Sequence, residues 1–536
     1  MDILHNFTCK LSSIIKKLNS KPFFINYLMP SLSGVLLFLA FPKPELFSLA
    51  WAALLPLFYS VTAAKNKLQA IFSGLITGLF FFFGTQYWIY HSLNHFGGIP
   101  FILSLFIVFL LCLYQSLYIA VFALMLWLMA KRWSLRRACY GAPFIWVCLE
   151  YLKGIIITGF PWSLLGYSQY RFIHLIQISN ITSVYGVSFL IVFFNSALFL
   201  AFFKKDITLK ENPVKKLKPV LIASLLLVLT ILYGAKRLPS LNYNEKVTVT
   251  LVQGNIPQEM KMNKDNREKI IGIYETLTLE KTPKNTDLVV WPESSLPFYF
   301  MSEEKYTKDF IDFQKRLGKN LLFGTDLIRG RAGNYLILTN SAVLLGKDGQ
   351  IAYVYDKIHM VPFGEYVPLR KLLFFVDKLV GSMGEFSPGS DYVLARAEVT
   401  DGRTASFGTH ICYEIIFPDL VRKFYRNGGD FIVTISNDAW FGDTSGPYQH
   451  LAMAVFRAVE NGKYLIRATN TGVSAIVGLD GHILQKTPLF ERTTLTGDIY
   501  KSDGNITFYT VFGDVFAYIC LIYSIIATAL LVIKRR

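Results

Sequence analysis

Residues Thr404 to Gly429 read TASFGTHICYEIIFPDLVRKFYRNGG, which is the pattern of a strand followed by a helix. The segment Ala405 to Ile411 predicts a buried strand. The segment Ile415 to Tyr425 predicts a helix that a proline opens and two glycines end. Cys412 is therefore expected at the turn between a strand and a helix.

Such a turn exposes a side chain at the end of a sheet, close to backbone N–H groups and the positive end of a helix dipole. We expect this environment to lower the pKa of the Cys412 thiol and to favour the reactive thiolate. A free cysteine is more often a small buried hydrophobic residue, so a catalytic role for Cys412 needs support from elsewhere in the chain.

The composition predicts a membrane protein. The chain has 536 residues, of which 53% are hydrophobic and 45 are Phe, and its mean hydropathy is +0.39. Apolar runs of the length that crosses a bilayer, about 20 residues, occur near 24–41, 46–62, 68–88, 101–129, 138–158, 183–203, 217–235 and 514–533. We predict domains at 1–238 (seven spans), 239–510 (a polar catalytic block) and 511–536 (the last span).

Lys and Arg occur in every second connection between these runs, at 10–21, 65–67, 131–137, 204–218 and 534–536. The connection from His91 to Pro100 contains neither residue. Because cytoplasmic loops are enriched in Lys and Arg, both termini are predicted to be cytoplasmic and the 239–510 block to lie outside. This topology and attraction to anionic lipid account for most of the +17 net charge, and no nucleic-acid-binding motif accompanies the basic runs.

The 239–510 block changes to short alternating strands and helices. Strands are predicted at 247–253, 287–291, 320–325, 336–345, 351–355, 405–411, 430–436, 463–470, 473–478 and 482–485, and helices at 266–280, 307–317, 415–425 and 450–462. Strands that alternate with helices, together with hairpins, predict a layered α/β domain with mixed sheets.

Three chemically reactive residues follow predicted strands: Glu293, Lys357 and Cys412. Sheet ends are where α/β domains gather side chains from distant parts of the sequence. An acid, an ammonium group and a thiol supply a general base, an oxyanion stabiliser and a nucleophile, which together suffice for acyl transfer. Taken singly, Glu293 could cap a helix and Lys357 could be a solvated surface charge.

Histidines give weaker alternatives. His410 could act as a base, but it shares a strand face with Cys412 at a spacing of about 7 Å, so we interpret it as structural. His91 and His95 lack further ligands for a metal, so they are interpreted as interfacial residues. Glu150, inside the fifth predicted span, should face the helix bundle or mark the membrane boundary. No metal and no cofactor are expected.

The short sequences around Glu293, Lys357 and Cys412 resemble those of the carbon–nitrogen hydrolase (nitrilase) superfamily. The Glu–Lys–Cys triad of that superfamily occurs in this chain order. With the flanking spans, almost the whole chain resembles the apolipoprotein N-acyltransferase family. The strings that carry the resemblance are 159–162 (GFPW), 253–258 (QGNIPQ), 291–294 (WPES), 355–366 (YDKIHMVPFGEY), 411–414 (ICYE) and 436–442 (SNDAWFG). One departure is Met262, where relatives often carry Trp.

The resemblance implies a polytopic α-helical membrane domain of about eight spans carrying an extracytoplasmic α/β nitrilase-like domain, an αββα sandwich. It implies that Glu293 is the general base and Cys412 the nucleophile. Lys357 would stabilise the oxyanion together with the backbone N–H of Tyr413, and Glu365 would be an additional carboxylate that orients Lys357.

The resemblance also assigns residues around this triad. Tyr413 and Glu414 would support the site, and the expected substrate-binding residues are Trp440, Phe441 and Trp162. The implied reaction transfers an acyl chain from a membrane phospholipid, through a Cys412 thioester, to the α-amine of a diacylglyceryl-cysteine on an apolipoprotein in the bacterial inner membrane. Apolar segments at Leu369–Gly384 and Pro297–Met301 are interpreted as a membrane-facing lid.

Two other functions stay open at this point. A membrane-tethered amidase of the nitrilase family would pass the acyl group to water, and no single side chain separates it from the transferase. A transporter or lipid-binding scaffold with an inactive external domain is the alternative outside enzymes. The intact set of Glu293, Lys357 and Cys412 argues against the scaffold.

Overall fold

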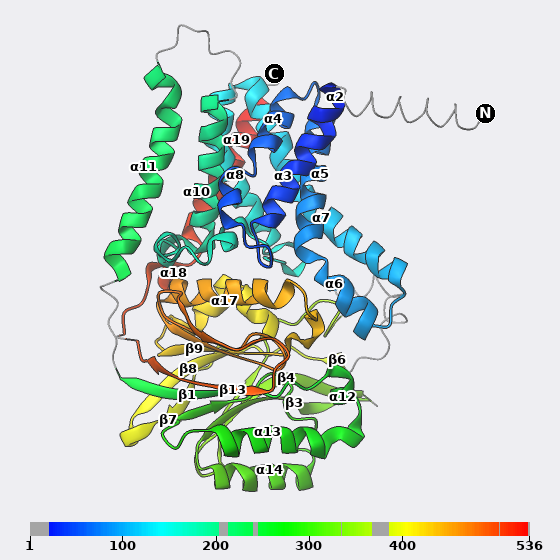
Figure 1. The fold of residues 1–536 in the computed structure, drawn as a ribbon, viewed down its shortest axis with the longest axis vertical. Coiled ribbons are helices and arrows are strands. Elements are labelled where there is room, and N and C mark those ends of the chain that lie inside the picture. The colour runs from blue at the N-terminus through cyan, green and yellow to red at the C-terminus, as the bar shows by residue number, and fades with distance from the viewer. Residues whose placement is uncertain are drawn as a thin grey trace, which may run out of the picture.

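Two β-sheets packed face to face lie against one end of a bundle of apolar helices (Figure 1). The computed structural model describes residues 21–202, 213–238, 245–333, 335–366, 385–502 and 504–533.

The first sheet has the strand order β13-β1-β2-β3-β4-β5, and β6 pairs with β4 outside this path. Its strands are β1 (Lys246–Gln253), β2 (Leu288–Val290), β3 (Asn320–Ala332), β4 (Tyr335–Leu345), β5 (Ile351–Asp356), β6 (Glu385–Phe386) and β13 (Thr493–Tyr500). The central strands β1, β2 and β3 are parallel, and β4, β5 and β13 join the path antiparallel. The short strand β6 pairs with β4 in parallel. The predicted mixed sheet is confirmed.

The second sheet has the order β12-β11-β10-β9-β8-β7. Its strands are β7 (Ala395–Glu398), β8 (Thr404–Ile411), β9 (Phe431–Ser436), β10 (Tyr464–Thr469), β11 (Ala475–Val477) and β12 (Ile483–Lys486). Here β8, β9 and β10 are parallel and the outer strands are antiparallel, so this sheet is mixed as well.

Helices cover the outer faces of both sheets, which gives four layers (Figure 1). Because side chains alternate along a strand, Val289 of β2 packs with α13 (Arg267–Lys281) and α14 (Glu304–Leu317). Its neighbours Leu288 and Val290 belong to the core between the two sheets. The second sheet is covered by α16 (Pro418–Tyr425) and α17 (Gly446–Asn461), and α17 lies between this sheet and the apolar helices (Figure 1).

Five helices among the described residues are long and apolar enough to cross a membrane. They are α5 (Lys67–Gln86), α7 (Phe101–Arg132), α10 (Ser179–Phe202), α11 (Pro213–Arg237) and α19 (Val515–Ile533). Their outer faces expose large apolar side chains such as Phe72, Ile102 and Leu221. Such faces are more stable in contact with lipid than in contact with water.

The remaining apolar segments differ in form. The first consists of α2 (Lys21–Phe23), η1 (Phe24–Leu28) and α3 (Met29–Leu39). The predicted run 46–62 is not one helix, because it divides into η2 (Phe47–Trp51) and α4 (Leu55–Ala63). The fifth predicted span corresponds to α8 (Leu135–Lys153). Short connecting helices are α6 (Trp88–His91), η3 (Ser92–Phe96), η4 (Ile156–Thr158), η5 (Leu165–Gln169), α9 (Ile173–Ile176), α12 (Gln258–Met262), η7 (Lys264–Asn266), η8 (Thr400–Gly402), η10 (Asp438–Phe441) and α18 (Phe508–Phe512).

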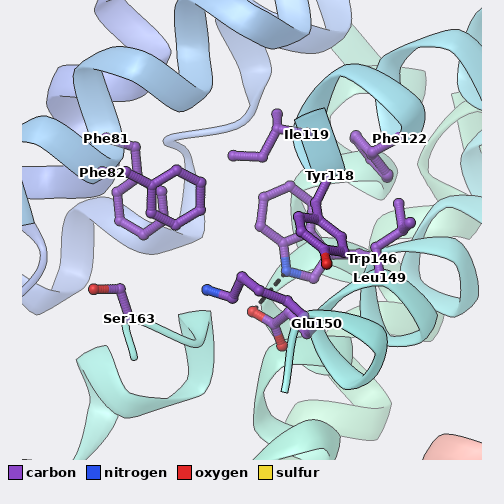
Figure 2. Close-up of a pocket in the computed structure, with 10 residues that line it drawn as sticks. Phe81, Phe82, Tyr118, Ile119, Phe122, Trp146, Leu149, Glu150 and Ser163 are labelled. Carbon is purple, nitrogen blue, oxygen red and sulfur yellow. Dashed lines mark hydrogen bonds between the residues drawn. The ribbon is translucent and has the colours of Figure 1, made fainter. Parts of the chain in front are cut away.

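Glu150 faces the inside of the helix bundle, which is one of its two predicted positions (Figure 2). Its Oε1 accepts hydrogen bonds from Trp146 Nε1 at 2.9 Å and from the Leu165 backbone N–H at 2.6 Å. Glu150, Lys153 and Ser163 line a cavity of about 20 Å³, which is room for about one water molecule. Most of the other lining side chains are apolar or aromatic. Lys153 Nζ, which donates to the Trp162 carbonyl oxygen at 2.8 Å, joins the end of α8 to the loop at 159–163.

Candidate active site

The structure brings Glu293, Lys357 and Cys412 together although they are far apart in sequence. Glu293 follows β2, Lys357 follows β5 directly, and Cys412 follows β8 directly, so two residues come from one sheet and one from the other. Lys357 Nζ lies 3.6 Å from Glu293 Oε1 and 2.8 Å from Glu365 Oε1. The thiol interacts electrostatically with both Glu293 and Lys357. The ends of the two sheets therefore form one charged cluster.

Both oxygens of Glu293 are held in place. Asn340 Nδ2 on β4 donates to Glu293 Oε1 at 2.8 Å, and the Asn437 backbone N–H donates to Oε2 at 2.8 Å. The Glu293 side chain is 8% exposed. The carboxylate thus has a fixed orientation in a largely dry site.

A glycine on β3, Gly324, allows the backbone at Glu293 to pack closely against that strand. A Cβ atom at Gly324 on β3 would lie 2.6 Å from the Glu293 Cα and 2.8 Å from the Pro292 carbonyl oxygen. Any side chain at this position would displace the turn that carries Glu293, so Gly324 is required for the close packing of the backbone here.

Cys412 has a strained backbone, with φ at +52°, in the left-handed region that non-glycine residues seldom adopt. It begins a short 3-10 turn, η9 (Cys412–Ile416), and helix α16 begins only at Pro418. The predicted strand, turn and helix are confirmed. A residue in such a backbone conformation stores strain that the surrounding structure must hold.

The expected lowering of the Cys412 pKa is wrong. Burial raises the pKa of the thiol, the Glu293 carboxylate raises it further, and Lys357 offsets only part of this rise. The physical reason is that no long helix starts at Cys412, so the dipole contribution is small and desolvation dominates. The resting site therefore holds a neutral thiol beside a carboxylate.

Lys357 stays charged. Burial lowers the pKa of its ammonium group, but Glu365 and Glu293 outweigh this effect, and the net pKa is raised above its usual value. Glu365 in turn accepts from the Val361 backbone N–H at 2.7 Å and from Asn340 Nδ2 at 2.9 Å. The site thus holds a permanent positive charge between two anchored carboxylates.

Glu414 is buried, and its carboxylate holds the turn that carries Cys412 (the nucleophile turn) through hydrogen bonds. Its Oε2 accepts from the Ile411 backbone N–H at 2.7 Å. Its Oε1 accepts from Tyr355 Oη and from the Ile358 backbone N–H, both at 2.7 Å. Glu414 therefore joins the turn after β8 to the turn after β5, on which Lys357 lies.

Aromatic side chains connect the site to the apolar helices. Tyr413 is 7% exposed, and its hydroxyl donates to the Gly159 carbonyl oxygen at 3.3 Å. Trp162 is 1% exposed, and its ring packs at a tilt against Trp88 with ring centroids 4.8 Å apart. Its Nε1 donates to Gln449 Oε1 at 2.7 Å. Trp162 is thus enclosed by protein side chains.

Trp440 and Phe441 lie on η10, after β9, and both are partly exposed. Trp440 packs edge-on against Phe96 at 5.2 Å, and the Ser92 hydroxyl donates to its carbonyl oxygen at 2.7 Å. Phe441 packs against Trp88 at 4.6 Å. These two rings, unlike that of Trp162, keep some surface available at the boundary with the helices.

The other sequence predictions have mixed outcomes. The proposed lid at Pro297–Met301 is wrong, because Phe298 and Phe300 are buried in the core under α13 and α14. The segment Leu369–Gly384 lies outside the described residues, as does the side chain of Met262.

The histidine interpretations agree with the geometry. His410 is fully buried beside Phe424 and Tyr425, and burial lowers its pKa to about 3. His91 and His95 stack with ring centroids 5.0 Å apart at the boundary between the apolar helices and the sheets. The described residues hold no group of three or more His, Cys, Asp or Glu side chains suited to a metal ion.

Sequence reasoning missed several residues of the site. Asn340 is inside a predicted strand, where an asparagine among apolar residues was the available signal. Asp326 on β3 has its pKa raised to about 7 by burial and by the carboxylates of Glu293 and Glu365. Lys261, whose pKa burial lowers to about 8, donates from Nζ to the Ser294 carbonyl oxygen at 3.0 Å. No local pattern marks Asp326 or Lys261.

The sequence of this chain is similar to family models and to known proteins along most of its length. Residues 33–197 match the family model "Apolipoprotein N-acyltransferase N-terminal domain", and residues 248–504 match "Carbon-nitrogen hydrolase". An apolipoprotein N-acyltransferase of Geobacter metallireducens is 41% identical over 94% of this chain and 95% of its own length. Those of Pasteurella multocida and Haemophilus influenzae are 34% and 33% identical, over 94% and 96% of both chains respectively. The chain is therefore an acyltransferase that belongs to the apolipoprotein N-acyltransferase family.

Proposed function

We propose that this protein acylates the α-amino group of the diacylglyceryl-cysteine at the N-terminus of apolipoproteins, with a membrane phospholipid as acyl donor. The observation that carries the proposal is the charged cluster of Glu293, Lys357, Glu365 and Cys412 at sheet ends that face apolar helices. Both substrates are lipids, which gives a reason for attaching such a site to a membrane. The names of the relatives support the choice of acceptor.

The first step forms a thioester. Glu293 takes the proton of the neutral Cys412 thiol as the sulfur attacks the ester carbonyl of the phospholipid. The developing oxyanion is stabilised by Lys357 and the Tyr413 backbone N–H. The carbon–oxygen bond of the ester breaks, the proton on Glu293 passes to the leaving oxygen, and lysophospholipid departs.

The second step forms the amide. The amine of the acceptor attacks the thioester carbonyl, Glu293 takes a proton from the amine, and the carbon–sulfur bond breaks. The proton on Glu293 then passes to the Cys412 sulfur, and the N-acylated product leaves. Glu365 orients Lys357, and Glu414 holds the Cys412 turn throughout. Trp440 and Phe441 supply the partly exposed aromatic surface for lipid chains, and Trp162 supports this surface from behind.

The topology follows from the charge pattern. We propose about eight spans in all, with residues 1–238 and 511–536 as the membrane domains and 239–510 as the catalytic domain. Both termini would be cytoplasmic, and the catalytic domain would lie on the outer face of the bacterial inner membrane. The basic connections at 65–67 and 131–137 support this orientation.

Intact-mass spectrometry of the full-length protein tests the function. The protein in detergent is incubated with phosphatidylethanolamine and no acceptor, alongside Cys412→Ala. We expect an acyl adduct that is absent from the variant and that a diacylglyceryl-cysteine peptide discharges, with the acyl chain then on its amine. An adduct discharged only by water would instead identify a membrane-tethered hydrolase. If the folded wild-type protein forms no adduct, both the transferase and the hydrolase hypotheses are wrong.

A further inference from the structure

Helix α17 places two side chains at the junction between the membrane helices and the nucleophile. Gln449 Nε2 donates to the Pro42 carbonyl oxygen at 3.0 Å, and its Oε1 accepts from Trp162. The next residue, His450, is fully buried, and its Nε2 lies 3.1 Å from the Cys412 carbonyl oxygen. Gln449 thus contacts connections between the apolar helices, and the next residue contacts the nucleophile turn.

The hydrogen position on His450 follows from its neighbours. The Cys412 carbonyl oxygen can only accept, so the 3.1 Å contact requires a hydrogen on His450 Nε2. His450 Nδ1 lies 3.0 Å from Arg467 Nη2, which can only donate, and 3.3 Å from Asp438 Oδ1, which can only accept, so in a neutral ring Nδ1 accepts from Arg467. A neutral imidazole that accepts at Nδ1 carries its hydrogen on Nε2. His450 Nε2–H therefore donates to the Cys412 carbonyl oxygen.

Asp438 fixes Arg467 in this position. Its Oδ2 pairs with Arg467 Nη2 at 2.6 Å, and its Oδ1 accepts from the Ser436 hydroxyl at 2.6 Å. Burial and the positive charge of Arg467 lower the pKa of His450 more than Asp438 raises it, in agreement with a neutral ring. Asp438, Arg467 and His450 are all fully buried, so water does not compete for these contacts.

The contact acts on a strained residue. Cys412 has φ at +52°, and Glu414 already holds the Ile411 N–H on one side of it. His450 holds the carbonyl on the other side. The peptide that contains this carbonyl also contains the Tyr413 N–H, so rotation of that peptide would move the proposed oxyanion donor.

We propose that His450 is a positioning residue for acyl transfer: its Nε2–H holds the Cys412–Tyr413 peptide so that the thiol and the Tyr413 N–H both face the acyl carbonyl. This inference rests on the proposed role of Cys412 as nucleophile. His450 itself touches no reacting atom.

The test compares two amides at this position. In His450→Gln the side-chain amide reaches the position of Nε2 and can donate to the Cys412 carbonyl, whereas in His450→Asn it reaches only the position of Nδ1. Because Asn is one methylene smaller than Gln, His450→Leu, which fills the site without a donor, separates packing from the hydrogen bond. A role limited to packing would leave His450→Leu about as fast as His450→Gln, whereas the proposed role makes it about as slow as His450→Asn. Met453→Leu, a buried change of similar volume on α17, is the matched control.

The full-length protein in detergent is mixed with p-nitrophenyl butyrate, and the burst of p-nitrophenolate gives the rate constant of Cys412 acylation. The Cys412 sulfur bonds to the acyl carbon, the ester carbon–oxygen bond breaks, and the thiol proton leaves through Glu293. We expect His450→Asn to be about 100-fold slower at saturating ester with KM nearly unchanged, because small misplacements of reacting groups have effects of this size. We expect His450→Gln to stay within about 10-fold of wild type, about the effect of one altered hydrogen bond, and Met453→Leu to match wild type.

Equal rate constants for the Gln and Asn variants, at equal unfolding temperatures, would overturn the inference. The soluble ester keeps this result separate from the proposed lipid donor. If wild type reacts with the ester but not with phospholipid, the donor is wrong and His450 is still tested. If Cys412→Ala gives the same burst as wild type, the proposed nucleophile is wrong.

Discussion

Asn340 Nδ2 lies 2.8 Å from Glu293 Oε1 and 2.9 Å from Glu365 Oε1, so one amide group holds the two carboxylates that flank Lys357. Two buried carboxylates near each other repel, and their charges persist only where a cation and hydrogen-bond donors compensate for them. Lys357 supplies the cation and Asn340 the shared donor. The geometry of the proposed base thus depends on a residue that performs no chemistry itself.

Replacing Asn340 with Leu should lower kcat by about 10- to 100-fold, since hydrogen bonds to charged groups contribute about 1.5–3 kcal/mol. KM should change little, because Asn340 holds the proposed base. Steady-state transfer to a diacylglyceryl-cysteine peptide measures both constants. Leu338→Met, on the same strand, is the control. A rise in KM with an unchanged kcat would assign Asn340 to substrate binding instead.

Replacing Gly324 with Ala should displace the turn that carries Glu293, because the new Cβ would lie 2.6 Å from the Glu293 Cα. We expect a loss of kcat of about 100-fold, as for other small shifts of a catalytic group. The same change at Gly272 on α13, where a Cβ meets nothing within 4 Å, is the control. Full activity of Gly324→Ala would show that this turn adapts without cost.

Asp326 should make the protein less stable as the pH rises from about 4 to about 7. Its pKa is raised to about 7 in the folded protein, whereas an unfolded Asp titrates near 4. In this range the folded state keeps a proton that the unfolded state has lost, so the free energy of unfolding falls with pH. Thermal unfolding in detergent at a series of pH values should show a flatter dependence for Asp326→Asn. The exposed Asp309→Asn should keep the wild-type dependence, and identical curves for all three proteins would refute the assignment.

Trp162→Phe should lower the unfolding temperature and kcat while leaving KM for the lipid donor nearly unchanged. Trp162 is 1% exposed and donates a hydrogen bond to Gln449, so its loss leaves a buried amide oxygen unpaired, at a cost of about 1–3 kcal/mol. Trp440→Phe, at a partly exposed ring, should instead raise KM. The opposite pattern for the two variants would place Trp162 in contact with the lipid.

The local sequence determined a large part of the structure. Short runs rich in apolar and β-branched residues predicted β1, β4, β8 and β9, because burial of one or both strand faces requires apolar side chains there. It did not reveal the edge strands β7 and β13, in which polar residues make up half of each strand. The run 46–62 is continuous in hydropathy, yet it divides into two helical pieces, because composition does not record where tertiary contacts bend the chain.

The same division applies to the candidate site. Glu293, Lys357 and Cys412 could be identified from the sequence because reactive residues at strand ends form a recognisable pattern. The pKa of Cys412, the shared amide of Asn340, and the contacts of Asp326 and His450 could not, because each depends on which groups folding brings within a few ångströms and on how much water it removes. The sequence by itself determined which residues carry the proposed chemistry, whereas tertiary structure alone decided their charges, their orientation and the side chains that hold them.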